Sequence, residues 1–398
     1  MYLKERGGGL GTSSMVTRYL FLLSLWAFSL YLVSNSAKKY AANLVEEFQM
    51  RLDADESKYA GFSHMLEEKL QSFSREIEGI QRQANQIAPP QTAATGMDDS
   101  SKLQITKSLV AVDRQIFSLW GQIRSKMPER IYYRKAKAVI VTGADEKYFF
   151  ALQNLIGSVH FWDPSRNIVV FDLGISQENL KKLNSIDRVK VFPSPIKSNL
   201  KNYAWKAYCI RYATERYGKA IWLDAGSDLR GDPKKIDQIL EDEDAFFVQG
   251  QDEDMTPWSH PQTLDFFRTN KVEMKGKYSF SGNLQGYVYD SQAYWDVLMV
   301  VEKCCQITEC IAPQGSSLSN HRYDQIAMSS AIYTNPRLII TPHTELLAAV
   351  RLQLDPNHKT ESSHIVWSAR GASHEYMKYI KQSGVVFDAP ELSELVKS

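Results

Sequence analysis

The chain has 398 residues and a formal net charge of +1, with 47 basic and 46 acidic side chains. This balance provides no strongly basic surface of the kind that nucleic acid requires, so we expect no nucleic-acid partner. A hydrophobic content of 43%, with 11% aromatic residues, is typical of a packed globular protein and excludes a disordered chain.

An uncharged segment near the N-terminus, Tyr19–Ala37, is just long enough to cross a bilayer. We expect residues 1–18 to form a short cytosolic tail and residues 19–37 a transmembrane signal anchor. The small polar residues at the end of this segment also fit a cleaved signal peptide, which is the alternative. A short tail ahead of a large C-terminal domain predicts a single-pass type II protein of the Golgi or endoplasmic reticulum membrane, with its domain in the lumen.

Residues 38–137 are predicted to form a helical stem. Apolar residues from Leu66 to Ile87 alternate at spacings of four and three, which is the pattern of a coiled coil. The proline-containing stretch 88–101 interrupts the helix as a linker, and a second run with the same spacing extends from Leu109 to Ile123. This pattern favours a homo-oligomer joined through the stem; the alternative is an amphipathic helix that packs on the domain.

Residues 138–398 are predicted to form the globular domain, in which apolar runs alternate with helical patterns. The predicted elements are a strand over Ala138–Ala144, a helix over Lys147–Phe161, a strand over Asn167–Gly174, a helix over Ser176–Ser185, a strand over Val189–Pro193, a helix over Tyr203–Gly218 and a strand over Ala220–Gly226. Continuous apolar strands are typical of parallel sheets covered on both faces. The pattern therefore predicts a Rossmann-like α/β domain with a mostly parallel sheet.

Small residues and acids occupy the ends of the predicted strands, where ligands bind in open α/β sheets. The candidate donor-binding residues at these ends are Thr142, Gly143, Ala144, Asp172, Asp224 and Gly226. Neither a GxGxxG loop nor a Walker lysine loop is present, which disfavours nicotinamide and flavin cofactors. A nucleotide bound without those loops indicates a nucleotide-diphosphate sugar, with UDP as the expected nucleotide.

Four segments together resemble a family of membrane-anchored proteins with a glycosyltransferase-like domain: AVIVTGADEKYFFALQNLIGSV, IVVFDLGIS, YAWKAYCI and AIWLDAG. The resemblance covers Ala138–Asp232, extends weakly to Gly371, and implies the GT-A fold of nucleotide-diphospho-sugar transferases. Ala207 replaces a family proline, which matters little because proline at a helix start only pre-sets the backbone. More seriously, Gly226 replaces the second acid of the Asp-x-Asp motif that usually holds a metal.

The resemblance implies a divalent cofactor, Mn²⁺ or Mg²⁺, and the missing acid leaves three interpretations open. In the first, Asp224 binds the metal or the donor ribose, and Asp228 contributes. In the second, transfer needs no metal, and basic groups such as Lys206 or Arg211 offset the charge of the diphosphate. In the third, the site is degenerate and the domain only binds.

Other residues offer alternative metal ligands. Asp252 and Asp254 have the Asp-x-Asp spacing after a strand-like run, although such acidic clusters are more often solvated loops. Some related enzymes lend a C-terminal histidine to the metal; the candidates are His343, His364 and His374, of which we select His364 together with Asp224 and Asp228.

Two later segments complete the predicted site. Phe280–Asp290 places small residues and two amides before an apolar strand, and a comparable segment lines the donor-sugar pocket of GT-A enzymes; the alternative is an ordinary turn. Its candidate donor-binding residues are Gly282, Asn283, Gln285 and Gly286. His321–Tyr333 is predicted to be a helix with Asp324 and Gln325 exposed in its first turn. Asp324 is the candidate catalytic residue that contacts the sugar or deprotonates the acceptor; alternatively it only favours the helix dipole.

The cysteines predict one disulfide at most. Cys304, Cys305 and Cys310 are close enough in sequence for one lumenal bond, whose pairing the sequence leaves open. Cys209 lies in an apolar helical pattern and is expected to be a buried thiol.

The residues and the resemblance predict a glycosyltransferase that moves a monosaccharide from a nucleotide-diphosphate sugar to a hydroxyl of a lumenal glycan or protein. The first rival is an inactive pseudo-transferase that binds a sugar nucleotide or a glycan. The second is a coiled-coil membrane tether with an α/β recognition head.

Overall fold

The structure is a computed structural model that describes residues 137–194, 200–336, 338, 340–349, 364–368 and 374–391. All of these residues belong to one unit, Leu109–Ser398. The predicted tail, anchor and coiled-coil stem lie outside the described residues and stay predictions. Within the described part of the chain, no helix is long and apolar enough to cross a membrane.

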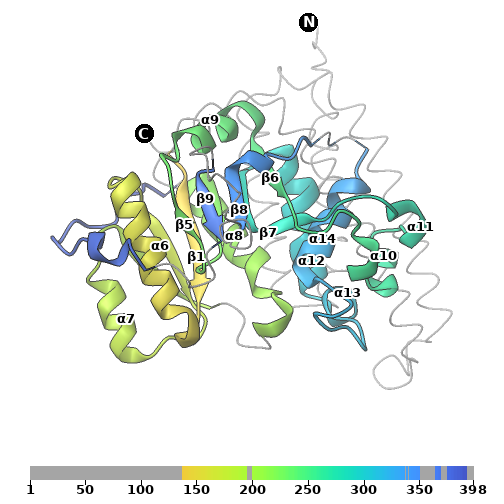
Figure 1. Cartoon of the computed structure of the whole chain (residues 1–398), viewed down its shortest axis with the longest axis horizontal. Coiled ribbons are helices and arrows are strands. Elements are labelled where there is room, and N and C mark those ends of the chain that lie inside the picture. Colours follow the sequence, from red (N-terminus) through yellow and green to blue (C-terminus); the bar gives the residue numbers. More distant parts are fainter. Residues whose placement is uncertain are drawn as a thin grey trace, which may run out of the picture. The chain divides into compact units, whose positions relative to one another are not determined.

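A mixed sheet lies at the centre of the described unit (Figure 1). Its strands are β1 (Val139–Ala144), β2 (Ile168–Asp172), β3 (Val189–Pro193), β4 (Lys219–Leu223), β6 (Ala245–Gln249) and β7 (Phe280–Val288), in the order β3-β2-β1-β4-β7-β6. The first four strands pair in parallel, whereas β7 is antiparallel to β4 and to β6. The predicted α/β fold with a mostly parallel sheet is confirmed, and all strands except β7 end at the same edge.

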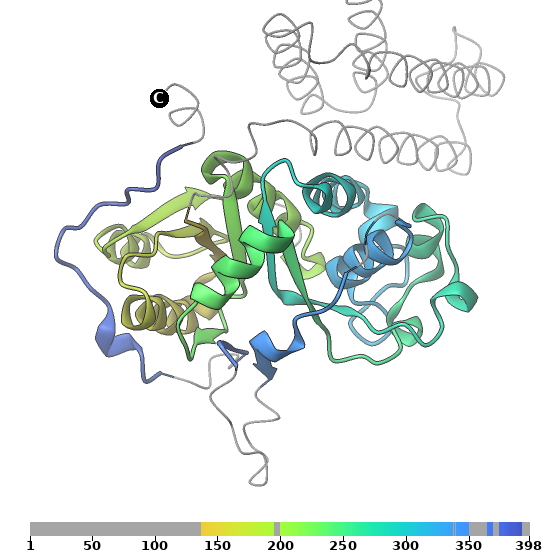
Figure 2. The ribbon, with the colours of Figure 1, turned by 90° about the horizontal axis from the view of Figure 1, so that it is seen from above.

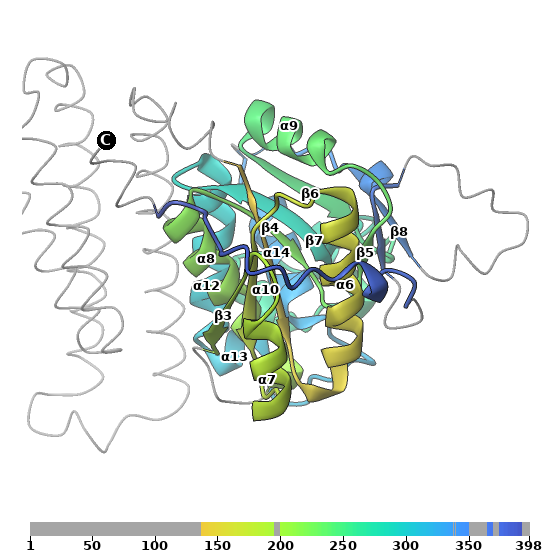
Figure 3. The same cartoon turned by 90° about the vertical axis from the view of Figure 1, so that its left-hand side faces the viewer.

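Helices cover both faces of this sheet (Figure 3). They are α6 (Phe149–Trp162), α7 (Gln177–Asn184), α8 (Trp205–Tyr217), α9 (Lys234–Glu243), α10 (Pro261–Phe266), α11 (Lys271–Met274), α12 (Met299–Cys305), α13 (Thr308–Ile311) and α14 (Tyr323–Tyr333). Buried side chains of α6, α7 and α9 pack with those of the strands in one core on one face. Helices α8 and α14 pack on the other face, and α12 packs against both of them.

A small second sheet and the C-terminal segment complete the unit. Strands β5 (Asp228–Leu229), β9 (Val366–Ser368) and β8 (Leu347–Ala349) form this sheet in that order. Residues 374–391 run along the outer side of the half that contains α6 and α7 (Figure 2). The carboxylate of Asp187 holds them there by accepting bonds from the backbone N–H groups of Gly384 (2.9 Å) and Val385 (3.1 Å).

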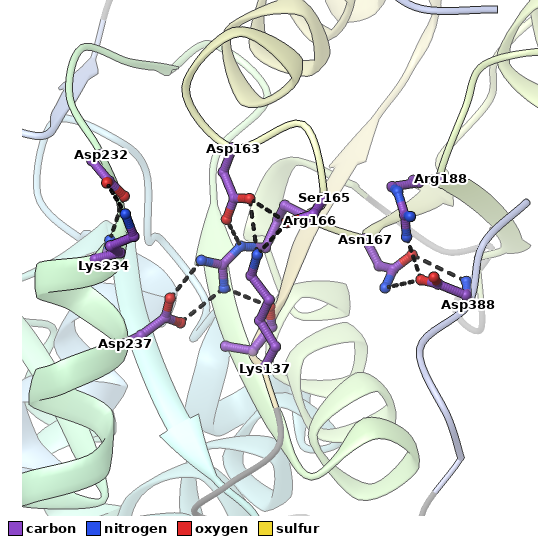
Figure 4. Close-up of polar contacts among 11 residues, drawn as sticks. Lys137, Asp163, Ser165, Arg166, Asn167, Arg188, Asp232, Lys234, Asp237 and Asp388 are labelled. Carbon is purple, nitrogen blue, oxygen red and sulfur yellow. Dashed lines mark hydrogen bonds and ion pairs between the residues drawn. The ribbon is translucent and has the colours of Figure 1, made fainter. Parts of the chain in front are cut away.

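Buried Arg166 connects the start of β1 to two helices (Figure 4). Its guanidinium donates to the carbonyl of Ala138 (2.8 Å) and to both carboxylate oxygens of Asp237 in α9 (2.8 and 2.5 Å). Its Nε donates to Asp163, which follows α6 (2.9 Å). Burial alone would lower the pKa of Arg166, but the two carboxylates raise it, so this cation is permanent.

Local sequence signals set several element ends as predicted. Ser176 caps α7 by accepting a hydrogen bond from the backbone N–H of Asn179 (3.3 Å). Gly218 ends α8 with a φ of 82°, which glycine adopts without steric cost. The segment predicted to precede an apolar strand is instead the strand itself, because β7 begins at Phe280 and its residues pair with both β4 and β6.

The structure selects one cysteine pairing. Cys304 and Cys310 form a disulfide, while Cys209 and Cys305 are buried free thiols. Cys209 is therefore the buried thiol that its helical pattern predicts.

His321 is a buried anchor just before α14. The backbone N–H of His260 donates to its Nδ1 (3.2 Å), and its Nε2 lies 3.2 Å from the carbonyl oxygen of Ile311. The ring is 0% exposed, and burial lowers its pKa from 6.5 to about 4. A neutral His321 therefore fixes the residues that begin α14.

We predict that this histidine makes the domain acid-sensitive. Between pH 6.5 and 4 the unfolded chain binds a proton at this position and the folded chain does not, so stability falls as the pH is lowered through that range. The loss approaches about 3 kcal/mol for a shift of this size. Urea unfolding at several pH values should show a flatter profile for His321→Gln than for the natural chain, whereas His374→Asn, at an exposed histidine, should leave the profile unchanged. If the free energy of unfolding changed equally with pH in His321→Gln and in the natural chain, this account would be contradicted.

Candidate active site

A buried lysine lies between two aspartates at the carboxyl end of β4. The Nζ atom of Lys206 is 3.0 Å from Asp224 Oδ1 and 3.1 Å from Asp324 Oδ2, and it donates to the carbonyl oxygen of Gly282 (3.0 Å). An ammonium group has three N–H donors, and three oxygens surround this one. We call Lys206, Asp224 and Asp324 the charged triad; its members come from the first turn of α8, the end of β4 and the first turn of α14.

The strand period explains how β4 orients its acid. Alternate residues of a strand point to the same face, so Asp224 lies on the face of Trp222. The indole N–H of Trp222 donates to Asp224 Oδ1 (2.8 Å), and the ring of Trp222 lies beneath Lys206 Nζ at 5.5 Å. Asp224 Oδ1 is thus held by two donors, while its side chain stays 40% exposed. An exposed, oriented carboxylate can accept a hydrogen bond from a hydroxyl group of a ligand.

Gly282 of β7 leaves room for the triad. A Cβ at this position would lie 2.8 Å from Asp324 Oδ2 and 3.3 Å from Lys206 Nζ. Any side chain larger than hydrogen would push the acid and the ammonium apart. The glycine is therefore required by the close approach of these two side chains, and its predicted role in donor binding stays a prediction.

The triad has one cation for two acids, and this imbalance sets its electrostatics. Burial alone would lower the pKa of Lys206, but the charges of Asp224 and Asp324 raise it, so the ammonium is permanent. Burial, together with the charge of Asp224, raises the pKa of Asp324 more than Lys206 lowers it. The proton affinity of Asp324 is therefore shifted in the direction that a general base needs.

The expected exposure of Asp324 is wrong. Its side chain is only 9% exposed, because α14 packs on the sheet with its first turn against β7 and Lys206. A solvated acid in the first turn would only interact favourably with the helix dipole. A buried acid such as Asp324 also needs the positive charge that Lys206 provides.

Two tyrosines border the triad with unusual backbone conformations. Tyr203 and Tyr323 have φ values of 58° and 40°, a region that bulky residues rarely adopt. Their rings are 6.2 Å apart, and the ring of Tyr203 lies 5.5 Å from Lys206 Nζ. Burial and the nearby Asp324 raise the pKa of Tyr203. Strained residues of this kind persist where the surrounding structure determines them, and they often lie at functional sites.

The other predicted strand-end residues lie at the same edge. Ala144 and Asp172 are register partners at the ends of β1 and β2. A Cβ on Gly143 would lie 3.0 Å from the ring of Trp205, so this glycine allows the start of α8 to pack on β1. Thr142 is buried, and its hydroxyl has no hydrogen-bond partner among the described residues. Asp172 accepts bonds from two backbone N–H groups of the following turn.

The amides and the second glycine of β7 have structural partners. Asn283 accepts a bond from Ser227 (2.7 Å) and donates to Ser368 (2.8 Å), which ties the turn after β4 to β9. Gln285 accepts from the hydroxyl of Tyr287 (2.8 Å). Gly286 contacts the ring of Phe246, where a Cβ would lie 2.2 Å from the ring.

Two other predicted charged residues are paired outside the triad. Asp228 is buried in β5, where Arg230 Nε (2.7 Å) and the amide of Asn154 (2.9 Å) donate to it. Arg211 lies in the helical layer, paired with Glu215 (2.9 Å) and Glu302 (2.7 Å).

The remaining candidate ligands also lie apart from the triad. Asp254 accepts bonds from the backbone N–H (2.9 Å) and the hydroxyl (2.8 Å) of Thr256, while Asp252 faces Arg322 at 3.8 Å. His343 pairs with Glu243 (3.1 Å), and His374 stacks edge-on against Phe150. His364 lies two residues before the start of β9.

The described residues do not make a ligand set for a divalent ion. Asp224 Oδ1 is bonded by Lys206 and Trp222, Gly226 supplies no ligand side chain, and Asp228 is neutralised by Arg230. No group of three His, Cys, Asp or Glu side chains suited to a metal occurs in the part of the chain that the structure describes. The divalent cofactor therefore stays a prediction, and no chemical step below depends on it.

Sequence reasoning missed the neighbours that orient the triad. Trp222 was detectable, since a residue two positions before a strand-end acid must share its face. The carbonyl of Gly282 and the conformations of Tyr203 and Tyr323 depend on how β7, α8 and α14 meet, and the sequence carries no local signal for them.

No protein-family model and no curated protein matches the chain. Solved structures similar to it include the bifunctional glycosyltransferase WbbM, at 14% identity and a TM-score of 0.37 over 54% of this chain and 40% of that one. Another is the galactosyltransferase LgtC in complex with donor and acceptor sugar analogs, at 13% identity and a TM-score of 0.40 over 61% of this chain and 96% of that one. A third is the glycosyltransferase GlyE of Streptococcus pneumoniae, at 12% identity and a TM-score of 0.33 over 48% of this chain and 42% of that one. These likenesses are distant, so the function proposed below rests on the residues of the site.

We predict that the triad is essential for stability. Lys206→Met leaves two facing carboxylates without their cation, which should lower the free energy of unfolding by about 3–5 kcal/mol. Urea unfolding of the full-length chain measures this loss. Adding Asp324→Asn to Lys206→Met should recover part of it, because one uncompensated charge is removed.

The control is Lys234→Met, which removes the same charge from an exposed pair with Asp232 and should not change stability measurably. Equal unfolding midpoints for Lys206→Met and Lys234→Met would show that the triad does not act as a buried ionic unit.

Proposed function

We propose that the protein is a glycosyltransferase that transfers a monosaccharide from a nucleotide-diphosphate sugar, with UDP as the nucleotide, to an acceptor hydroxyl. The observation that carries the proposal is the charged triad at the carboxyl edge of the sheet, where α/β folds bind ligands. A structural ion pair alone needs neither an exposed carboxylate at Asp224 nor strained tyrosines beside it.

Each member of the triad has a separate role in this proposal. The exposed part of the Asp224 carboxylate accepts a hydrogen bond from a hydroxyl group of the donor, and Trp222 and Lys206 fix the orientation of Asp224. Lys206 keeps the two acids at a fixed distance and supplies positive charge close to the reacting groups. Asp324 takes the proton of the acceptor hydroxyl, a role favoured by the burial that raises its pKa.

The reaction balances with these groups. The bond between the anomeric carbon and the diphosphate oxygen breaks, and its electron pair leaves with the nucleoside diphosphate. The acceptor oxygen forms a new bond to the same carbon, and its proton passes to Asp324. Gly282 supports this step, since its missing side chain leaves Asp324 and Lys206 in contact.

The cellular setting in the proposal comes from the sequence. The uncharged segment 19–37 favours a type II anchor in the Golgi or endoplasmic reticulum membrane, and the heptads favour a homo-oligomer. The acceptor would then be a glycan or glycoprotein of the lumen, and the GT-A type of this α/β domain is part of the same proposal.

We predict that Asp324→Asn removes turnover while the donor still binds. The amide keeps the shape of the acid but cannot take a proton, so kcat should fall by about 10²–10⁴-fold. Release of UDP from a panel of UDP-sugars by the full-length chain measures kcat, and calorimetry with UDP measures binding. The matched control is Asp242→Asn, an exposed acid of α9 that should keep full turnover.

Three outcomes decide between the candidate functions. Loss of kcat with intact UDP binding supports the transferase. Binding of UDP by the natural chain without turnover of any donor would favour the pseudo-transferase. Full turnover by Asp324→Asn would remove Asp324 from the mechanism.

A further inference from the structure

The guanidinium group of Arg322 is held in place two residues before Asp324 of the triad. It precedes Tyr323 and Asp324 at the start of α14, and its Cζ lies 4.2 Å from the ring centroid of Trp258. Its backbone N–H also donates to the carbonyl oxygen of Trp258 (3.1 Å). Both the main chain and the side chain of Arg322 are therefore held on the short helix Thr256–Trp258.

This guanidinium has an incomplete set of partners. The one ion pair that it forms within the described part of the chain is with Asp252 Oδ2, 3.8 Å from its Nε, which is too long for a hydrogen bond. The same carboxylate oxygen accepts a bond from the hydroxyl of Ser279 (3.3 Å). The Nε of Arg322 is buried and has no hydrogen-bond partner among the residues that the structure describes, although the side chain is 23% exposed overall.

Two other arginines of the same domain, buried Arg166 and half-buried Arg211, show the contrast. Arg166 donates to a carbonyl and to two carboxylates at 2.5–2.9 Å, and Arg211 pairs with two glutamates at 2.7–2.9 Å. Those two side chains are neutralised within the protein. Arg322 has the fork geometry that binds carboxylate, sulfate or phosphate groups, and most of its donors are available for one.

The position of Arg322 relative to the triad indicates which substrate group it meets. Strand β6 runs in the direction of β4, so the connection from β6 to β7 that carries Asp252 and Trp258 emerges at the edge of the triad. Arg322 lies on the side of β7 and β6. The candidate donor-binding residues at the ends of β1 and β2 lie on the opposite side of β4.

Given the glycosyl transfer proposed above, on which this inference rests, we propose that Arg322 binds an acidic group of the sugar acceptor. The recognised chemistry is a planar or tetrahedral oxyanion, which a uronic acid carboxylate or a sulfate or phosphate ester supplies. The stacked guanidinium is the specificity-determining residue, because a neutral acceptor leaves its donors unpaired in a partly buried position.

The experiment compares acidic and neutral probes on the full-length chain. Affinities for methyl β-glucuronide, methyl β-glucoside and its 6-sulfate are measured by NMR titration, and the affinity for UDP by calorimetry. We expect the acidic probes to bind about tenfold or more tightly than the neutral one. Arg322→Met should abolish this preference and leave UDP affinity unchanged, and Arg322→Lys should retain part of it because the charge stays but the fork is lost.

The control is Lys271→Met, which removes an equal charge from an exposed position of α11 and should keep the preference. Three results would overturn the inference: equal binding of acidic and neutral probes by the natural chain, an unchanged preference in a folded Arg322→Met, or a loss of UDP affinity in that variant, which would assign Arg322 to the diphosphate. Failure of the proposed function looks different, since the natural chain would then bind no UDP while still binding the acidic probes through Arg322.

Discussion

The buried ammonium of Lys206 is the interaction on which the site depends. A charged lysine is costly to bury unless acids compensate its charge, and two ionised acids repel each other unless a cation lies between them. Lys206, Asp224 and Asp324 meet both conditions at 3.0–3.1 Å, although they come from three different elements. The triad therefore fixes the positions of α8, β4 and α14 relative to one another.

The rest of the domain positions this interaction. Arg166 fixes the start of β1 against α6 and α9, far along the strands from the site. The antiparallel β7 places Gly282 where any side chain would separate the charges. His321 fixes the residues before Asp324, and the same short segment presents Arg322 on the ring of Trp258. In the two proposals, Asp224 binds the donor and Arg322 binds the acidic group of the acceptor.

Much of the fold was predictable, because continuous apolar runs and cap residues such as Ser176 act locally. Asp224 and Lys206 were found as separate strand-end and helix-start residues, but nothing local indicates that they bond to each other. Asp324 was expected in solvent because a polar first turn is usually exposed, and only its packing against β7 reveals the burial. The resemblance to GT-A enzymes predicts Gly286 in the donor pocket, and the structure shows that this glycine also packs against Phe246. Close packing and ligand approach both require glycine and look alike in sequence.

The most direct test of the central claim is the binding of UDP to the full-length chain by calorimetry, with Asp224→Asn as the comparison. The account predicts saturable binding with one site and a dissociation constant of about 1 μM–1 mM, the range usual for enzyme substrates. Asp224→Asn should weaken this binding by about tenfold or more, since it replaces one of the two charged acceptor oxygens at the strand end with an N–H donor. Absence of saturable binding, or equal binding by Asp224→Asn, would contradict a nucleotide-sugar site at the end of β4.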